Sequence, residues 1–250
     1  MKLEKLLEGL TYELLEGSLD AEVTEIILDS RKAVPGCLFT CIKGAVADGH
    51  RFAPDVAAKG AAVIVVEDDI RPAIGQALAD AKAPDGTCAA MPAIVKVPDS
   101  RYALACISAA WFGHPAKELT TIGITGTKGK TTTTYMVKSI LEKCGHKVGL
   151  IGTIEAIIGD KRIPAANTTP ESYLVQKYFR EMVEAGCDSV VMEASSQGFM
   201  LHRTAGFIFD YGIFPRISRM WAMPAALSVN LGGCCISWPL RYHSTASSYS

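Results

Sequence analysis

The sequence predicts an α/β protein that consists of two consecutive units, the second of which is built on a mainly parallel sheet. Short aliphatic and β-branched runs alternate with longer stretches in which apolar residues recur at helical spacing. The alternation restarts at about residue 117, where the proline-containing stretch "HPAKE" (114–118) is typical of a linker. Because strands joined through helices form right-handed crossovers, we expect ligands to bind at the carboxyl ends of the strands.

The first unit covers residues 1–115 and begins with "MKLEKLLEGL", whose apolar spacing predicts an amphipathic helix over 1–10. Aliphatic runs predict its strands, which lie at 37–42, 61–66 and 93–97. Helical spacing predicts its other helices, which lie at 52–60, 71–82 and 99–114.

The second unit covers residues 116–214 and repeats the pattern. Its strands are predicted at 119–125, 147–154 and 187–195. Its helices are predicted at 131–145, closed by a glycine, and at 170–186, which starts with proline and ends with glycine. We expect a sheet of about three or four strands in this unit.

Composition indicates a globular protein of the reduced cytoplasm. Of the 250 residues, 49% are hydrophobic and 20% are charged, with a net charge of -1, so no charged surface for nucleic acid or an anionic membrane is predicted. No run approaches the roughly 20 apolar residues of a membrane span, so no membrane insertion is expected. The eight cysteines are dispersed, which favours free thiols over disulfides or a zinc site.

The last stretch, 215–250, differs from everything before it. All 26 acidic residues and every lysine lie in the first 214 positions, and the last 36 show no sustained period. We expect an aberrant, poorly ordered tail produced by a disrupted reading frame or truncation near Phe214, and the alternative is genuine divergence.

The glycine-rich stretch "GITGTKGKTT" (123–132) lies between a predicted strand and a predicted helix. Its glycines permit backbone angles at which successive N–H groups converge on an anion, and the helix adds its positive end. Lys130 supplies a cation for phosphates and Thr131 a hydroxyl for Mg²⁺. The strict GxxxxGK[ST] pattern is not met, because Ile124 stands at its first position. The alternative is a simple strand-to-helix turn, but the sequence favours a nucleoside triphosphate site.

The segment "GTKGKTTTT" resembles the "GTNGKTTT" loop of the Mur ligases, ATP-dependent enzymes that extend the peptide stem of peptidoglycan precursors. Lys128 replaces their usual asparagine. The resemblance implies that ATP is held by Gly126, Thr127, Lys128, Gly129, Lys130, Thr131 and Thr132. It also implies that Thr131 and Glu193 share Mg²⁺ and that Lys130 and Glu193 serve the reaction centre.

Two further resemblances concern the substrate. The stretch "LDSRKAVPGCLFTCIKGAVADGHRF" (28–52) is similar to the uridine-nucleotide-binding start of the family and implies that Leu28 and Ser30 touch the uridine. The stretches "NTTPES" (167–172) and "MEASSQGFMLHR" (192–203) are similar to the member that adds the third stem residue. They imply that the muramoyl dipeptide is held by Asn167, Thr168, Thr169, Ser195 and Arg203.

Each of these residues also has a structural alternative. Ser30 and Thr169 can be turn or capping residues, Glu193 a solvated acid, and Arg203 half of a surface ion pair. We expect His202 to pack or bond locally rather than act as a base. Gln197 and Ala194 depart from the family pattern.

The implied reaction joins a diamino acid to UDP-N-acetylmuramoyl dipeptide through an acyl phosphate, in the synthesis of cell wall precursors that support cell shape and division. The implied fold is an N-terminal UDP-binding domain and an incomplete P-loop-type central domain, without the C-terminal domain that selects the amino acid. The family's carbamylated lysine is also missing, because the last lysine is Lys177, so this chain is expected to be inactive. Alternatives are the dipeptide-adding member, a non-catalytic nucleotide- or UDP-sugar-binding module, and a P-loop ATPase of the partitioning type. The sequence specifies neither the amino acid nor the oligomeric state, and it indicates no protein partner.

Overall fold

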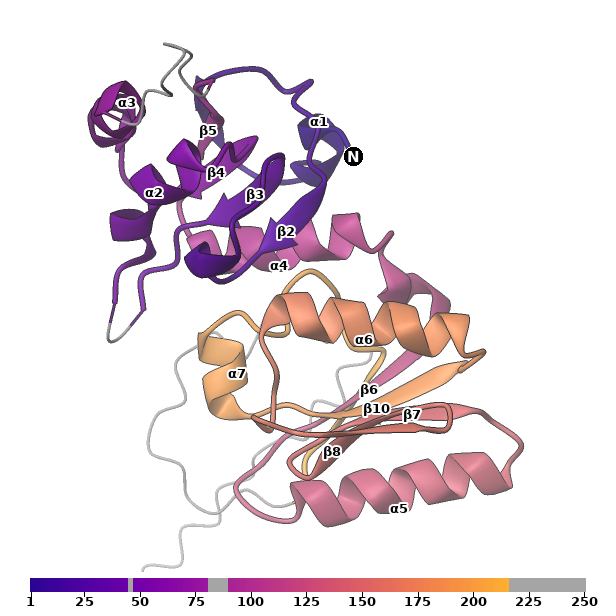
Figure 1. The fold of residues 1–250 in the computed structure, drawn as a ribbon. Helices are drawn as coiled ribbons and strands as arrows, with labels where there is room; N and C mark the ends of the chain where they lie inside the picture. The colour runs from indigo at the N-terminus through magenta and orange to yellow at the C-terminus, as the bar shows by residue number, and fades with distance from the viewer. Residues whose placement is uncertain (45–46, 81–89, 216–250) are drawn as a thin grey trace, which may run out of the picture.

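The computed structural model describes residues 1–44, 47–80 and 90–215, and it contains two sheets. Figure 1 shows one sheet in the N-terminal part and the other in the C-terminal part of the chain, with helices on the faces of each. The α/β class and the mainly parallel sheet of the second unit are confirmed, and the first sheet is mainly parallel as well. Of the predicted tail at 215–250, all but Pro215 lies outside the described residues.

The first sheet has the strand order β1-β5-β4-β3-β2. Its strands are β1 (Glu13–Glu16), β2 (Glu25–Ile27), β3 (Cys37–Thr40), β4 (Val63–Val66) and β5 (Ala93–Lys96). Strands β2 to β5 are parallel, and β1 pairs with β5 in the antiparallel direction. Because β3 and β4 are buried along their whole lengths, their continuous apolar runs fill a core on each face of the sheet.

Helices and short 3-10 turns connect these strands. They are α1 (Leu3–Leu6), η1 (Ser30–Lys32), η2 (Gly49–Phe52), α2 (Ala53–Ala58), α3 (Arg71–Asp80) and α4 (Ser100–Trp111). The helix predicted over 1–10 is wrong in length, because the helix ends at Leu6, and Gly9 just beyond its C-cap has a left-handed φ of 77° that is incompatible with a longer helix. Strands β1 and β2 were not predicted, since both are short edge strands with charged ends.

The second sheet has the order β11-β6-β10-β7-β8-β9. Its strands are β6 (Thr120–Ile124), β7 (Val148–Ile151), β8 (Glu155–Ile158), β9 (Lys161–Pro164), β10 (Ser189–Glu193) and β11 (Tyr211–Ile213). The first four strands in that order are parallel, whereas β8 and β9 form an antiparallel hairpin. The expectation of three or four strands is wrong, because neither this hairpin nor β11 was recognised.

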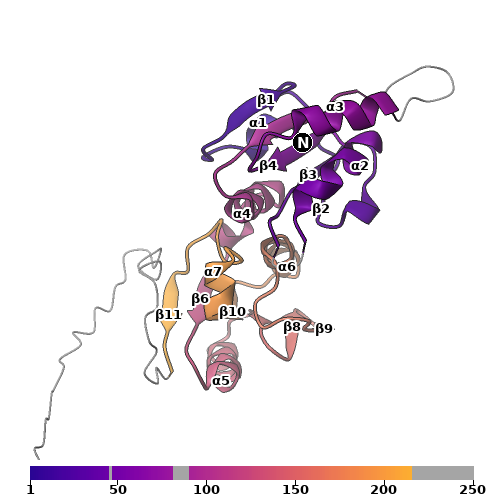
Figure 2. The ribbon, with the colours of Figure 1, turned by 90° about the vertical axis from the view of Figure 1, so that its left-hand side faces the viewer.

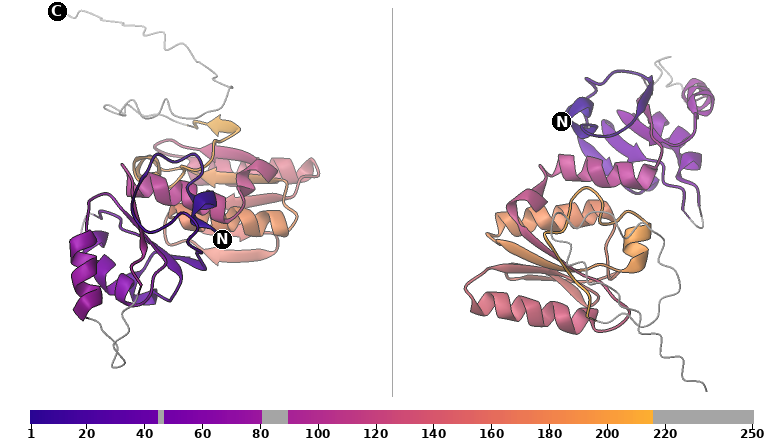
Figure 3. Two further views of the ribbon diagram at one scale, coloured as in Figure 1. Left: turned by 90° about the horizontal axis from the view of Figure 1, so that it is seen from above. Right: turned by 180° about the vertical axis from the view of Figure 1, so that it is seen from behind.

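Two long helices cover opposite faces of the second sheet. Helix α5 (Lys130–Lys143) lies on the face away from the first sheet, and α6 (Ser172–Glu184) lies on the face toward it, as Figures 1 and 3 show. Short elements η3 (Pro115–Glu118) and α7 (Ser196–Met200) complete this part of the chain. Figure 2 shows β11 at one edge of the sheet and the β8–β9 hairpin at the other.

The two parts meet where α4 contacts α6. The Arg180 guanidinium donates to the Phe112 carbonyl at 2.9 Å and pairs with Glu118 at 2.8 Å. His202 Nε2 lies 3.3 Å from Asp99 Oδ2, at the N-terminus of α4. His202 therefore makes a polar contact between the parts, with a residue distant in the chain rather than the local partner that was expected. The division at about residue 115 stays a prediction.

Among the described residues, no helix is both long and apolar enough to cross a bilayer. The described cysteines are all free thiols: Cys37, Cys41, Cys106, Cys144 and Cys187. Burial raises the pKa of Cys41 to about 12, so its thiol stays protonated at neutral pH.

Gly123 in the central strand β6 tests how tightly the second core is packed. A Cβ there would lie 2.9 Å from the Phe209 ring, which is buried and makes an edge contact with Phe207. We expect Gly123→Ala to lower the free energy of unfolding by about 1–3 kcal/mol in urea titrations, because the ring has no room to move. Gly75→Ala, within α3 with open space around it, should leave stability unchanged or raise it. Equal effects of the two changes would contradict this account of the core.

Candidate functional site

The glycine turn at the end of β6 is shaped to receive an anion. Gly126 and Gly129 have φ values of 146° and 84°, which other residues rarely adopt, and Gly129 is the N-cap of α5. The turn therefore leads directly into the helix, whose first N–H groups have no partner within the helix. These donors and the helix dipole together favour a bound phosphate or carboxylate.

A cavity of about 350 Å³ opens at this turn. Its lining residues are Thr127, Lys128, Gly129, Lys130, Thr131, Thr132, Thr153, Thr168 and Glu193. The Lys130 ammonium donates to the Gly126 carbonyl at 2.9 Å, so it closes the turn on itself. Six of the seven residues that the resemblance assigned to ATP thus line the cavity, together with Thr153 and Thr168, whereas Gly126 lies in the turn and accepts from Lys130.

Glu193 is the only carboxylate among the residues that line this cavity, and its side chain is fully buried. The Thr131 hydroxyl donates to its Oε2 at 3.1 Å. Thr153 donates to Oε1 through its backbone N–H at 3.0 Å and to Oε2 through its hydroxyl at 3.0 Å. The alternative of a solvated acid at Glu193 is therefore wrong.

The arrangement of Glu193 and Thr131 fits Mg²⁺. This ion is usually held in nucleotide sites by one or two carboxylates together with phosphate oxygens and water, rather than by a cage of protein ligands. One carboxylate and one threonine hydroxyl beside an anion cradle form such a donor set. Among the described residues there is no group of three or more histidine, cysteine, aspartate or glutamate side chains that could hold a metal.

The residues assigned to the dipeptide surround the end of β10. The buried Thr169 hydroxyl lies 3.0 Å from the Glu193 carbonyl oxygen and 3.1 Å from Ser195 Oγ. Arg203 donates to the Thr169 carbonyl at 3.0 Å and pairs with Glu171. The Thr168 hydroxyl lies 3.1 Å from the Thr153 hydroxyl and donates to it, because the Thr153 proton goes to Glu193, whereas Asn167 is exposed and does not line the cavity.

The structural alternatives hold in part for this group. Ser195 caps α7 by accepting from the Gly198 N–H at 3.0 Å, so it has a structural role whether or not it binds a ligand. Arg203 does form an ion pair, but its side chain is only 13% exposed and its buried Nε has no hydrogen-bond partner. A polar ligand beside Arg203 would satisfy that donor.

A second cavity, of about 560 Å³, lies at the carboxyl ends of β2 and β3. Its lining residues are Leu28, Asp29, Ser30, Arg31, Phe39, Thr40, Ile42, Gly44, Ala47, Gly49 and Phe52. Both residues assigned to uridine, Leu28 and Ser30, are among them. At the rim, hydrogen bonds from Arg31 lower the pKa of Asp29 to about 2, so this carboxylate is charged at neutral pH.

Thr40 is the buried polar residue of this second cavity that sequence reasoning missed, as it missed Asp29 and Arg31 at the rim. It is 4% exposed, and its hydroxyl has no hydrogen-bond partner. A buried hydroxyl without a partner is costly, so its position in a cavity wall points to a polar ligand. The run "CLFTCI" signals only a buried strand, in which one threonine carries no distinct pattern. Thr153 was missed for a similar reason, because it follows β7 in an unmarked "GTI" triplet.

Comparison with known proteins gives matches over most of the chain. The sequence matches "Mur ligase family, catalytic domain" over residues 22–112 and "Mur ligase middle domain" over residues 124–220. It is 43% identical over 219 residues to a UDP-N-acetylmuramoyl-L-alanyl-D-glutamate–2,6-diaminopimelate ligase of Clostridium perfringens. It is 41% identical over 220 residues to the enzyme of that name from Bacillus licheniformis.

These matches cover 88% of this chain but 42% and 41% of the two relatives, so the chain spans less than half of their length. A solved structure with the same ligase name has a TM-score of 0.66 at 18% identity and covers 91% of this chain and 42% of the other. A MurF crystal structure from Acinetobacter baumannii has a TM-score of 0.51 at 24% identity, covering 78% of this chain and 35% of the other. Both structural similarities concern the fold.

The sequence matches, the shared fold and the glycine turn that leads into α5 all agree. The chain belongs to the Mur ligase family, of which it carries the N-terminal and middle domains.

Proposed function

We propose that this chain provides the ATP site and the UDP-sugar site of a Mur ligase that adds the third stem residue to UDP-N-acetylmuramoyl-L-alanyl-D-glutamate. The observation that carries the proposal is the buried Glu193 carboxylate, bonded to Thr131 at the edge of the glycine turn. Relatives at more than 40% identity are named as ligases that use 2,6-diaminopimelate. We therefore propose diaminopimelate as the amino acid, a choice that the sequence itself did not specify.

The residues around the first cavity would serve ATP and Mg²⁺. The α5 N-terminus and Lys130 would neutralise phosphate charge, while Thr131 and Glu193 would hold the ion. Thr153 orients Glu193 through two of its hydrogen bonds. Bound ATP would supply the phosphoryl group that activates the substrate carboxylate. The protein contributes mainly positioning and charge neutralisation to such a transfer.

The second cavity would hold the uridine part of the substrate. Phe39, Phe52 and Leu28 supply apolar surface, whereas Ser30 and Thr40 supply hydroxyls. A nucleoside needs this combination, because its base is flat and largely apolar on its faces but polar at its edges. Arg203, with its unpartnered Nε, would contact the muramoyl dipeptide near the end of β10.

Lys130→Ala tests the phosphate site. We expect the affinity for Mg·ATP, measured by isothermal titration calorimetry, to fall by about 10- to 100-fold, because a charged hydrogen bond to phosphate is lost. Lys143→Ala is the matched control, since Lys143 is an exposed lysine at the other end of the same helix. Unchanged ATP affinity in Lys130→Ala would remove the assignment of this turn to ATP.

Glu193→Gln tests the metal site. Glutamine keeps the shape of the side chain and can still accept from the Thr153 N–H, but it has no charge for the ion. We expect ATP affinity to lose most of its dependence on added Mg²⁺, with ATP binding in EDTA retained. The exposed Glu184→Gln serves as the control for a general charge effect. A variant whose ATP affinity still rises with Mg²⁺ as in the parent chain would show that Glu193 does not hold the ion.

Thr40→Val tests the second cavity through two effects of opposite sign. Valine has nearly the same shape but lacks the unpartnered hydroxyl, so we expect the free energy of unfolding to stay the same or rise. The affinity for UMP should fall by about 2- to 10-fold, because one ligand hydrogen bond is lost. Thr11→Val, at an exposed threonine of the same part of the chain, is the control. Unchanged UMP affinity would contradict the assigned contact.

A further inference from the structure

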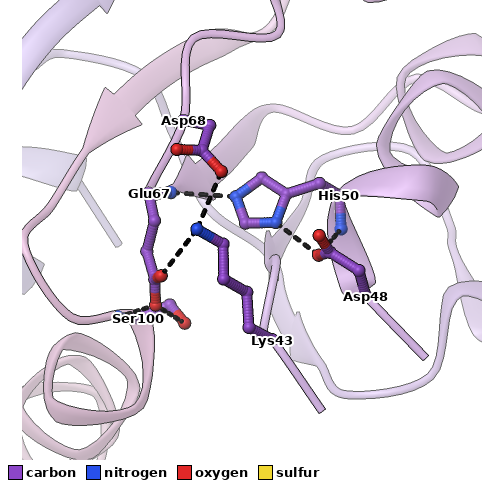
Figure 4. Close-up of polar contacts among 6 residues, drawn as sticks. All are labelled: Lys43, Asp48, His50, Glu67, Asp68 and Ser100. Atoms are coloured by element: carbon purple, nitrogen blue, oxygen red, sulfur yellow. Dashed lines mark hydrogen bonds and ion pairs between the residues drawn. The ribbon is translucent and has the colours of Figure 1, made fainter. Parts of the chain in front are cut away.

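Six polar side chains gather beyond the carboxyl ends of β3 and β4, next to the cavity that contains Thr40. Figure 4 shows them: Lys43, Asp48, His50, Glu67, Asp68 and Ser100. The group centres on His50, which is only 8% exposed. None of the six lines either cavity, so the proposed ligand contacts leave this network without a role.

The hydrogen bonds of His50 determine its protonation state. The Glu67 backbone N–H donates to His50 Nε2 at 2.9 Å, so this nitrogen carries no proton. The other ring nitrogen, Nδ1, lies 2.6 Å from Asp48 Oδ1 and therefore donates its proton to that carboxylate. The ring bridges two segments as a neutral imidazole in one tautomer.

The Glu67 end of this bridge is held in turn by Ser100 and Lys43. Ser100 donates to Glu67 Oε1 through its N–H at 2.9 Å and its hydroxyl at 2.7 Å. Lys43 Nζ lies 3.3 Å from Glu67 Oε2 and 2.8 Å from Asp68 Oδ2. Burial alone would raise the pKa of Glu67, but the Ser100 and Lys43 contacts outweigh it and lower that pKa.

The His50 end of the bridge belongs to the wall of the second cavity. His50 lies in η2, whose ends Gly49 and Phe52 both line that cavity, as do Gly44 and Ala47 before it. The Gly49 N–H donates to the Ile42 carbonyl at 2.9 Å. We call this described set, Gly44, Ala47, Gly49 and Phe52, the η2 wall. Its backbone is bonded to the end of β3, and the His50 ring ties it to the end of β4 through the Glu67 N–H, beside the contacts of Lys43 with Glu67 and Asp68.

We propose that His50 is a positioning residue for the ligand of the second cavity: its neutral ring holds the η2 wall against β4, and protonation of the ring releases that wall. The nature of the ligand, a uridine nucleotide, rests on the proposed function. The bridge itself rests on the contacts of His50 and would stand for any ligand of this cavity.

The hydrogen bond at His50 Nε2 determines whether acid weakens or strengthens ligand binding. A proton on Nε2 would face the Glu67 N–H, so the protonated ring and this hydrogen bond exclude each other. The charged groups in the network around the ring are the carboxylates of Asp48, Glu67 and Asp68 and the Lys43 ammonium. Ligand affinity should therefore be higher when the ring is neutral and lower when it is protonated.

Two substitutions at His50 separate its two hydrogen bonds. In His50→Gln the side-chain oxygen can take the place of Nε2, accept from the Glu67 N–H and remain unprotonated. In His50→Asn the shorter amide can still donate to Asp48 but does not reach Glu67. Uridine is the probe, because it has no group that titrates between about pH 5 and 8.

In NMR titrations we expect the full chain to bind uridine about 3- to 10-fold more weakly at about pH 5 than at about pH 8. A decrease of this size corresponds to the loss of one hydrogen bond. His50→Gln should bind with an affinity that does not change with pH. His50→Asn should bind at all pH values as weakly as the acidified parent chain. A flat profile for the parent chain, or a pH-dependent one for His50→Gln, would overturn the proposal.

A measurement without ligand separates this proposal from the assignment of uridine. The ¹⁵N shifts of the His50 ring should show the Nδ1–H tautomer at alkaline pH, and the Gly49 and Phe52 amides should shift when the ring is protonated. If they do while uridine fails to bind at any pH, His50 holds the wall and the uridine assignment is wrong. If uridine binds equally at both ends of the range, the uridine assignment stands and the role of His50 is wrong.

Discussion

The structure of the first cavity depends on a single constraint, the burial of the Glu193 carboxylate. A buried charge is stable only when hydrogen bonds replace its lost water, and here the donors come from α5 and from the segment after β7. Both lie beside Glu193 because β6 and β7 are its parallel neighbours, with Glu193 opposite Ile124. A shift of one residue in this register would turn the carboxylate to the other face of the sheet. The register of β6, β7 and β10, the start of α5 and the shape of the first cavity therefore depend on one another.

Local sequence patterns predicted the elements that carry their own period. The strands and helices around the glycine turn were predicted within a few residues, because β6, α5 and α6 are long or strongly apolar. Strand β11 was missed because its three residues pair with β6, far earlier in the chain, and the β8–β9 hairpin was missed because its strands are short and β9 begins with two charged residues. The same limit applies to the site. Lys130 and Thr131 lie in a motif, whereas Thr153 and Thr40 gain their meaning only from what surrounds them in space.

The two cavities belong to different sheets, so their relation depends on how the two parts of the chain contact each other. The segment that carries Arg203 also forms this contact. Its neighbour His202 pairs with Asp99, and a Cβ on Gly206 would lie 2.6 Å from the Ala105 carbonyl, which shows how closely the segment approaches α4. Under the proposed function, one extended substrate would reach from the first sheet to Arg203. A change at this contact would then alter the alignment of the substrate as well as stability.

The hydrogen bond from Lys130 to the Gly126 carbonyl has a consequence for the thermodynamics of binding. It keeps the turn in a closed loop in the absence of phosphate, so little conformational entropy is lost when an anion enters. The ligand must instead displace an existing bond, and the enthalpy of the new contact is reduced by that of the old one. Binding at this turn should therefore be an exchange of partners within a preorganised loop, with a smaller heat than the number of new contacts suggests.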